Sequence, residues 1–108
     1  MISQDVFGQI ELRVGEILTA ERVSGSDRLL KLTVDLGGER RIIVGGLGQS
    51  YMPEELPGMQ VVVVANLAPA RIKEIESAGM LLGVGCEDAK AVALLTVNRR
   101  VLNGALIV

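Results

Sequence analysis

The sequence predicts an all-β domain, a small Greek-key barrel built from short strands. Much of the chain alternates apolar and polar residues with the period of a β-strand, and turn-forming residues recur between the alternating segments. Only one short segment, around residues 52–56, is convincingly helical. The pattern leaves a β-sandwich of similar strand count open as an alternative. A chain of 108 residues, 49% of them hydrophobic, suits a single domain covering residues 1–108.

The first half of the chain predicts three strands. Residues 10–23 alternate for much of their length, and Gly15 is expected to mark a bulge or sharp bend in this first strand. Residues 24–27 (Ser-Gly-Ser-Asp) form a turn cluster, and residues 29–36 alternate again as the second strand. Gly37-Gly38 predicts a tight hairpin turn that leads into a third strand over residues 40–44.

A short helix is expected next, because Pro53 suits a first helical position and acidic residues follow it. Pro57-Gly58 ends this helix, and the valine-rich run at residues 60–65 predicts a strand covered on both faces. Further strands are predicted at residues 79–85, 91–97 and 105–108, with a turn at Glu87-Asp88. An OB-fold has its helix between the third and fourth strands. We therefore expect a five-stranded Greek-key OB-fold barrel with additional C-terminal strands.

The residue types argue against catalysis. The chain has no histidine, and Cys86 is its only cysteine, which excludes a Ser-His-Asp triad, a Cys-His pair and the common metal sites. The adjacent acids Glu54-Glu55 and Glu87-Asp88 are interpreted as charges at a helix start and a turn. Residues 45–48 (Gly-Gly-Leu-Gly) lack the Lys-Ser/Thr of a phosphate-binding loop. We predict a protein that is not an enzyme and that needs neither metal nor cofactor.

Charge and composition limit the kind of partner. A single cysteine, no signal peptide and no membrane-spanning apolar run predict a cytoplasmic protein without a membrane partner. The net charge is −2, whereas nucleic-acid-binding domains are usually basic, so phosphate contacts would require a local cluster of cations. Phe7 and Tyr51 are the only aromatic residues, so the chain offers little for base stacking.

Five sequence motifs occur in a defined order: residues 10–15 (IELRVG), 24–37 (SGSDRLLKLTVDLG), 51–56 (YMPEEL), 63–69 (VVANLAP) and 75–82 (IESAGMLL). In order and spacing they resemble the structure-specific tRNA-binding domain family. This family includes the domain appended to the C-terminus of many methionyl-tRNA synthetases, its free-standing counterparts, and the tRNA-binding part of a cytokine precursor of multisynthetase complexes. The resemblance runs from about Phe7 to the C-terminus and is greatest to the synthetase appendage. Because the sequence starts at Met1, we expect a free-standing protein or a separately encoded subunit.

The resemblance implies an OB-fold barrel, a homodimer formed through the C-terminal strands and loops, and binding to the outside bend of tRNA by shape. It predicts a non-catalytic module that acts in trans or as an accessory subunit of methionyl-tRNA synthetase, whose catalytic subunit is then a partner. Two alternatives stay open: a dimerisation module with little RNA binding, and a chaperone-like member of the same superfamily. The apolar residues 105–108 need to be covered, which is compatible with dimerisation.

Three site residues follow from the resemblance. The family's Ser-x-x-Met element corresponds to Ser77 and Met80. The Ser77 hydroxyl could donate to a phosphate or ribose, or could bond the backbone of a turn. Met80 could pack on a ribose or base, or belong to the core. Asn66 corresponds to the family's Asn before Leu-x-Pro, and we expect it to orient the loop that follows it rather than to contact RNA.

Six cations are candidates for phosphate contacts, although plain surface charge is the default interpretation of each one alone. In order of preference they are Arg71 and Lys73 in the loop after Pro69, then Arg28 and Lys31, then Arg40 and Arg41. This loop departs from the family pattern, since Ala70 stands where a cation is usual and Glu74 where glycine is usual. One positive charge fewer and one negative charge more should weaken phosphate binding, so we expect modest affinity or a need for dimer avidity.

Overall fold

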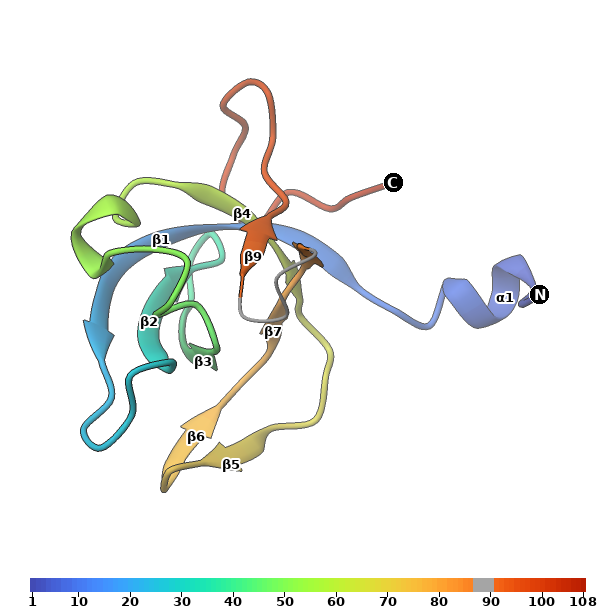
Figure 1. Cartoon of the computed structure of the whole chain (residues 1–108). Helices are drawn as coiled ribbons and strands as arrows, with labels where there is room; N and C mark the ends of the chain where they lie inside the picture. Colours follow the sequence, from blue (N-terminus) through green and yellow to red (C-terminus); the bar gives the residue numbers. More distant parts are fainter. Residues whose placement is uncertain (87–90) are drawn as a thin grey trace.

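The computed structural model describes residues 1–86 and 91–108, so the turn predicted at Glu87-Asp88 lies outside the described residues. Almost all of its regular structure is β-strand (Figure 1). The elements in chain order are helix α1 (Gln4–Phe7), strands β1 (Leu12–Arg22), β2 (Leu30–Asp35) and β3 (Arg40–Gly45), the 3₁₀ turn η1 (Pro53–Glu55), and strands β4 (Gln60–Val64), β5 (Ala70–Ile72), β6 (Ile75–Ser77), β7 (Met80–Leu81), β8 (Gly83–Gly85) and β9 (Val92–Leu94).

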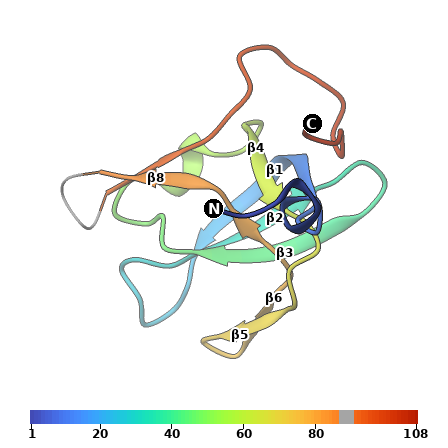
Figure 2. The same cartoon turned by 90° about the vertical axis from the view of Figure 1, so that its right-hand side faces the viewer.

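The main sheet has five strands in the order β3-β2-β1-β4-β7, and all neighbours are antiparallel. Strand β1 is long enough to pair with β4 through its first half and with β2 through its second half. The sheet therefore curls around its own inner face into a half-barrel (Figures 1 and 2). The all-β prediction is confirmed, and the curled sheet has the OB-like barrel arrangement.

The core is aliphatic, as the near absence of aromatic residues requires. On β2 the side chains of Leu30, Leu32 and Val34 are fully buried, while the residues between them are only partly buried. This is the period of two that the sequence shows. Strand β4 is buried along Gln60–Val63, which confirms the prediction of a strand covered on both faces.

The hairpin between β2 and β3 turns at Gly37 and Gly38, as predicted. Both residues have positive φ values, +77° and +103°, which glycine adopts without steric cost. The carboxylate of Asp35 accepts a hydrogen bond from the Gly37 amide (2.8 Å) and one from the Asn103 side chain. These two hydrogen bonds, with the Gly37 amide contributing most, hold the pKa of Asp35 below its ordinary value.

Gly15 does not mark a bulge, which is one of the two features expected there. Its pairing with Val61 continues a regular β1–β4 register, and the irregularity in β1 falls between Ile17 and Thr19. The expectation of a bulge at Gly15 is therefore wrong. A Cβ at this position would lie 2.6 Å from Cγ1 of the buried Val34, so glycine is required by close packing inside the curled sheet.

Replacing Gly15 by alanine is expected to lower the free energy of unfolding by about 1–3 kcal/mol, because the added methyl group overfills the core. Gly85→Ala is the matched control. It is also a strand glycine, and no described atom lies within 4 Å of its Cβ position. Its effect should stay within about 0.5 kcal/mol. Urea unfolding of both variants tests this, and equal effects would contradict the packing argument.

Two helical segments differ from the prediction. The helix expected around residues 52–56 is only the 3₁₀ turn η1, because Pro57 and Gly58 stop it after three residues, although Pro53 does begin it. Helix α1 was not predicted. Its first turn is capped by Ser3, whose hydroxyl accepts a hydrogen bond from the Val6 amide at 3.2 Å.

The second half of the chain also differs in detail. Residues 79–85, expected as one strand, contribute β7 to the main sheet and β8 to a separate hairpin with β9. Residues 70–77, expected as a loop, form the hairpin β5–β6. Residues 105–108 make only an isolated bridge, between Leu106 and Arg13, rather than a last strand. They occupy the β1 edge that the shorter β2 leaves uncovered.

Candidate nucleic-acid interface

Two connections of the barrel meet at one end. One joins β1 to β2, and the other joins β4 to β7 and contains the β5–β6 hairpin. Val23 and Leu29, at the ends of the β1–β2 connection (residues 23–29), form a buried cluster with Val44 of β3. Ile72 and Ile75 of the β5–β6 hairpin pack against this cluster. Figures 1 and 2 both show the connection and the hairpin at the end of the barrel away from residues 97–103. OB-folds commonly bind oligonucleotides with these two connections and the face of the second and third strands.

Four of the predicted cations lie at this end, and we call Arg28, Lys31, Arg71 and Lys73 the cationic end. Arg28 is exposed on the β1–β2 connection, and its guanidinium lies against Gly46. Arg71 and Lys73 are exposed on the hairpin, and the Lys73 ammonium lies about 4.0 Å from the Cβ position of Gly25 in the connection. The hairpin therefore brings its cations next to the β1–β2 connection.

The four cations differ in how they are paired. Lys31 is opposite Val44 in the β2–β3 ladder, and its ammonium lies 3.6 Å from the Glu21 carboxylate. Within residues 1–86 and 91–108, Arg28, Arg71 and Lys73 take part in none of the ion pairs. Their charges are the ones best placed to meet phosphate groups, because exposed cations without a partner lose least when they bind an anion.

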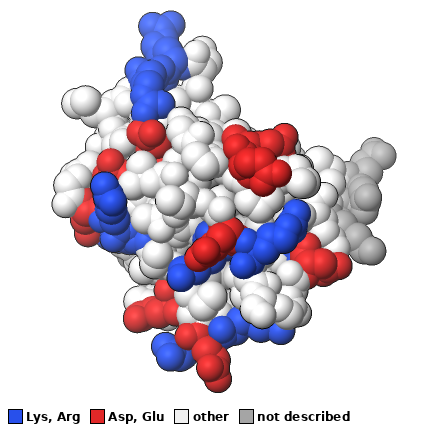
Figure 3. All heavy atoms as spheres, turned by 90° about the vertical axis from the view of Figure 1, so that its left-hand side faces the viewer, with Lys and Arg blue, Asp and Glu red and all other residues white. Residues whose placement is uncertain are grey.

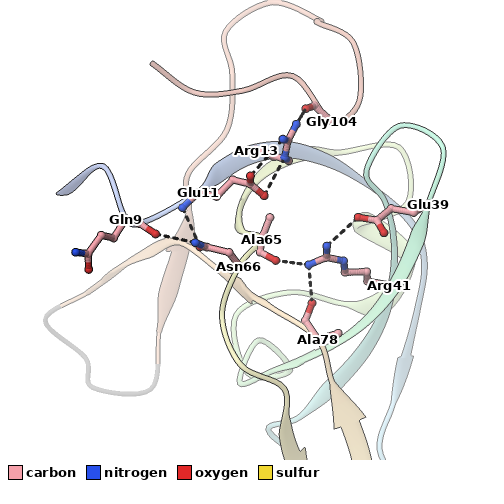
Figure 4. Close-up of polar contacts among 9 residues, drawn as sticks. All are labelled: Gln9, Glu11, Arg13, Glu39, Arg41, Ala65, Asn66, Ala78 and Gly104. Atoms are coloured by element: carbon pink, nitrogen blue, oxygen red, sulfur yellow. Dashed lines mark hydrogen bonds and ion pairs between the residues drawn. The ribbon is translucent and has the colours of Figure 1, made fainter. Parts of the chain in front are cut away.

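Arg40 and Arg41 do not join this group. Arg40 is exposed opposite Asp35, at the far end of β3 beside the Gly37-Gly38 turn. Arg41 is half-buried and pairs with Glu39 at 2.8 Å. Its guanidinium also donates to the backbone carbonyls of Ala65 and Ala78, as Figure 4 shows. Arg41 thus ties β3 to the ends of β4 and β6, and its charge is occupied within the protein.

Asn66 holds the N-terminal segment rather than the loop that follows it, which corrects our expectation. Its side-chain oxygen accepts a hydrogen bond from the Glu11 amide (2.8 Å), and its side-chain nitrogen donates to the Gln9 carbonyl (2.7 Å) (Figure 4). Beside it, Arg13 holds the pKa of Glu11 below its ordinary value, through a hydrogen bond and its charge.

Ser77 is buried, whereas Met80 is exposed at the surface. Ser77 is only 3% exposed, and its hydroxyl bonds backbone, as one of the two expected roles required. Met80 is 53% exposed, so the alternative that it belongs to the core is wrong. It lines a largely apolar groove of about 340 Å³ between β3 and the β7–β8 segment, together with Ile43, Val44, Gly45, Gly46, Leu47, Leu81, Gly83, Gly85 and Val92.

The charges of the surface are mixed. Figure 3 shows basic and acidic side chains interleaved across one face, without a large patch of either sign. On the hairpin, Arg71 has Glu76 as its cross-strand neighbour, and Glu74 follows Lys73 in the turn. This agrees with the overall negative charge of the chain. The weakened phosphate binding expected from Glu74 stays a prediction.

The hairpin turn carries backbone strain. Lys73 and Glu74 have φ values of +50° and +65°, the only positive φ values among the non-glycine residues that the structure describes. Such turns normally use Asn-Gly or Gly-Gly, because at positive φ a Cβ atom lies too close to the following carbonyl oxygen. Ile72 and Ile75 flank the turn and are cross-strand partners. The missing glycine is the reason why the sequence did not reveal the hairpin.

We expect Glu74→Gly to raise the free energy of unfolding by about 1 kcal/mol, because glycine adopts a positive φ without the steric cost that glutamate has. It should also strengthen tRNA binding, because a negative charge is removed. Glu74→Gln removes the charge but keeps the strain, so it should strengthen binding without stabilising the fold. Thermal unfolding and tRNA titration of both variants separate the effects. Equal stabilisation by Gln and Gly would contradict the strain.

The described part of the chain contains no group of three or more His, Cys, Asp or Glu side chains placed to hold a metal ion. Its helices are also too short to cross a membrane.

The geometry agrees with comparisons to known proteins. A family model described as "Putative tRNA binding domain" matches residues 12–106. The methionine--tRNA ligase of Caldanaerobacter subterraneus subsp. tengcongensis is 46% identical over 106 residues, which cover 98% of this chain and 16% of that protein. The Thermotoga maritima ligase is 47% identical over 104 residues, or 96% of this chain and 16% of that one. The chain therefore corresponds to a small, non-catalytic part of these ligases.

Solved structures also match almost the whole chain. The MetRS related protein from Pyrococcus horikoshii superposes with a TM-score of 0.92 at 36% identity, over 99% of this chain and 97% of that one. The chaperone CsaA from Bacillus anthracis str. Ames superposes with a TM-score of 0.91 at 30% identity, over 100% and 99% of the two chains. Sequence, fold and family model agree, and the protein belongs to the tRNA-binding domain family.

Proposed function

We propose that this protein binds tRNA through the cationic end and recognises the shape of the tRNA rather than its sequence. The observation that supports this most is the convergence of Arg28, Lys31, Arg71 and Lys73 on the two connections that OB-folds use for oligonucleotides. Cations placed in this way contact phosphates, which position the RNA but carry no base information.

The side chains around the cationic end favour backbone contacts. Tyr51, one of only two aromatic residues in the chain, is half-buried, and its hydroxyl accepts a hydrogen bond from the Leu94 amide. Neither Tyr51 nor Phe7 lies on the two connections, so stacking of unpaired bases contributes little there. Met80 offers an exposed apolar side chain suited to a ribose. Structured RNA is recognised largely through such phosphate and ribose contacts.

We further propose that the chain works as a single accessory domain in the cytoplasm, in trans or as a subunit or domain of methionyl-tRNA synthetase. Its similarity to a segment of methionine--tRNA ligases supports this role. A module that holds tRNA raises its effective concentration at a catalytic partner without taking part in the chemistry.

We also propose a homodimer formed through the N- and C-terminal segments. Phe7, Ile10 and Leu106 are each 46–56% exposed, and they line a groove of about 310 Å³ with neighbouring residues of both segments. Figures 1 and 2 place α1 and the C-terminus on the same side of the barrel. Apolar side chains gathered at such a groove are typical of an interface, and a second copy would give two cationic ends and an avidity gain.

The test is retardation of total tRNA at low and moderate salt with duplex DNA as competitor, and with a sizing column in parallel. Binding that prefers tRNA and weakens with salt supports the proposal. A clean dimer that fails to retard tRNA at low salt would leave the role of a dimerisation module. Leu106→Asp should give a monomer with weaker retardation, while Leu67→Asp, another exposed leucine, should leave the dimer intact.

A chaperone-like function is the second candidate, favoured by the apolar groove at Met80 and by the similarity to a protein named as chaperone CsaA. Unfolded chains would bind this groove through apolar side chains. The test is suppression of aggregation of a heat-unfolded model client. Wild-type activity that Met80→Ser abolishes would support this function.

A further inference from the structure

Ser77 lies where the barrel would otherwise be open. β3 and β7 are the two outer strands of the main sheet, and no ladder pairs them in the described chain. The end of β6 crosses this seam instead. The Val44 amide of β3 donates to the Ser77 hydroxyl oxygen at 2.9 Å, and the Ala78 amide donates to the Ile42 carbonyl at 2.9 Å. One side chain thus satisfies an edge amide that a neighbouring strand would normally bond.

We infer that Ser77 is a positioning residue whose hydroxyl latches the β5–β6 hairpin onto β3, and so places Arg71 and Lys73 at the cationic end. The hairpin pairs with no other strand in the part of the chain that the structure describes. An isolated two-stranded hairpin is marginally stable in water, so its position depends on what it docks against. The hairpin docks through Ile72 and Ile75 on the buried cluster and through the hydrogen bonds of Ser77 and Ala78 with β3. Arg41 of β3 adds a longer hydrogen bond to the Ala78 carbonyl.

The hydroxyl is also poorly placed to contact RNA directly. Ser77 is 3% exposed and Val44 is 6% exposed. The hydroxyl accepts from the Val44 amide and donates to the Gly79 carbonyl at 3.5 Å. Turning it outward would leave the buried Val44 amide without a partner, which is costly. In the Ser-x-x-Met element the serine therefore faces inward, and Met80 is the residue that faces the solvent.

The two roles predict different salt dependence. A neutral hydroxyl that contacts RNA releases no counterions, so its loss would leave the slope of log affinity against log salt unchanged. Loss of a latch displaces two cations together, and each phosphate contact contributes about 0.9 to that slope. If Ser77 holds the hairpin in place, Ser77→Ala should reduce the slope by up to about 2. If Ser77 contacts RNA directly, the slope should not change.

One of the two tests of this inference measures tRNA binding, so that test rests on the proposed function. In tRNA titrations we compare Ser77→Ala, the double variant Arg71→Gln with Lys73→Gln, and all three changes together. A latch predicts that adding Ser77→Ala to the double variant weakens binding by less than about twofold, because the two act through the same contacts. Fully additive losses with an unchanged salt slope for Ser77→Ala would overturn it.

The second test needs no RNA. Hydrogen exchange of the free protein should show the Val44 amide and the hairpin amides exchanging at least about tenfold faster in Ser77→Ala, with the Val62 amide unchanged. Ser50→Ala is the matched control, because its hydroxyl accepts from the Val92 amide at 2.8 Å, in β9. Its loss should leave the Val44 amide unaffected. Unchanged exchange at Val44 in Ser77→Ala would overturn the latch even in a protein that binds tRNA, and faster exchange would support it in one that does not.

Discussion

Replacing Arg28, Arg71 and Lys73 together by glutamine is expected to lower the affinity for tRNA on the order of 100-fold at low salt. Each lost phosphate contact should cost about 1 kcal/mol and reduce the salt slope by about 0.9, so the slope should fall by about 2–3. The fold should be unaffected, because all three side chains are exposed and take part in none of the ion pairs of the described residues.

The control changes charge elsewhere on the molecule. Arg40 is exposed at the far end of β3, and Arg99 is exposed in the segment at the end opposite the hairpin (Figure 1). The variant Arg40→Gln with Arg99→Gln lowers the net charge by two and should change the slope little. Titrations of tRNA from 50 to 300 mM salt give both slopes. If both variants lost the same affinity for tRNA per charge removed, the net charge, and not the cationic end, would be what attracts tRNA.

Replacing Leu32 by alanine is expected to lower the free energy of unfolding by about 2–5 kcal/mol, from lost burial and the cavity left behind. Leu32 is fully buried in the centre of the curled sheet, paired with Ala20 on β1 and Ile43 on β3. The buried cluster around it is aliphatic, and the half-buried Tyr51 packs against this cluster. For a domain of this size, the melting temperature should fall by about 10–20 °C.

Leu67→Ala provides the comparison for this loss, because Leu67 is 45% exposed. Its free energy of unfolding should change by less than about 0.5 kcal/mol. At low temperature, where both variants are folded, tRNA affinity should equal that of the wild type, because neither side chain belongs to the cationic end. Calorimetry and tRNA titration measure the two properties separately. A Leu32→Ala variant as stable as Leu67→Ala would contradict the assigned core.

The strands of the first half of the chain were predicted well, because their positions follow from the local alternation of apolar and polar residues. Buried and half-buried residues alternate along β2 in the way that the sequence shows, and the Gly37-Gly38 turn needs only the conformational freedom of its own residues. Gly15 was misinterpreted, since glycine in a strand can mark a bulge or a close approach. Only the positions of Val34 and Val63 around it distinguish the two.

The hairpin β5–β6 shows why the candidate site was harder to predict. Its turn uses Lys73 and Glu74 at positive φ, without the glycine or asparagine that would signal it. Its position at the β1–β2 connection comes from Ile72 and Ile75 docking on Val23, Leu29 and Val44. A short hairpin stabilised by contacts distant in sequence leaves no strong local signal.

By itself the sequence determined the all-β class, the aliphatic core, the absence of histidine-based chemistry and, through its ordered motifs, the tRNA-binding family. These properties follow from residue types and from the spacing of neighbours along the chain. Tertiary structure alone decided which candidate residues face the solvent. Ser77 and Arg41 turn inward and Met80 outward, because β6 closes the seam beside β3, where the hydrogen bond from Val44 to Ser77 joins residues 33 positions apart. Exposure at such a seam depends on long-range packing, which no local pattern encodes.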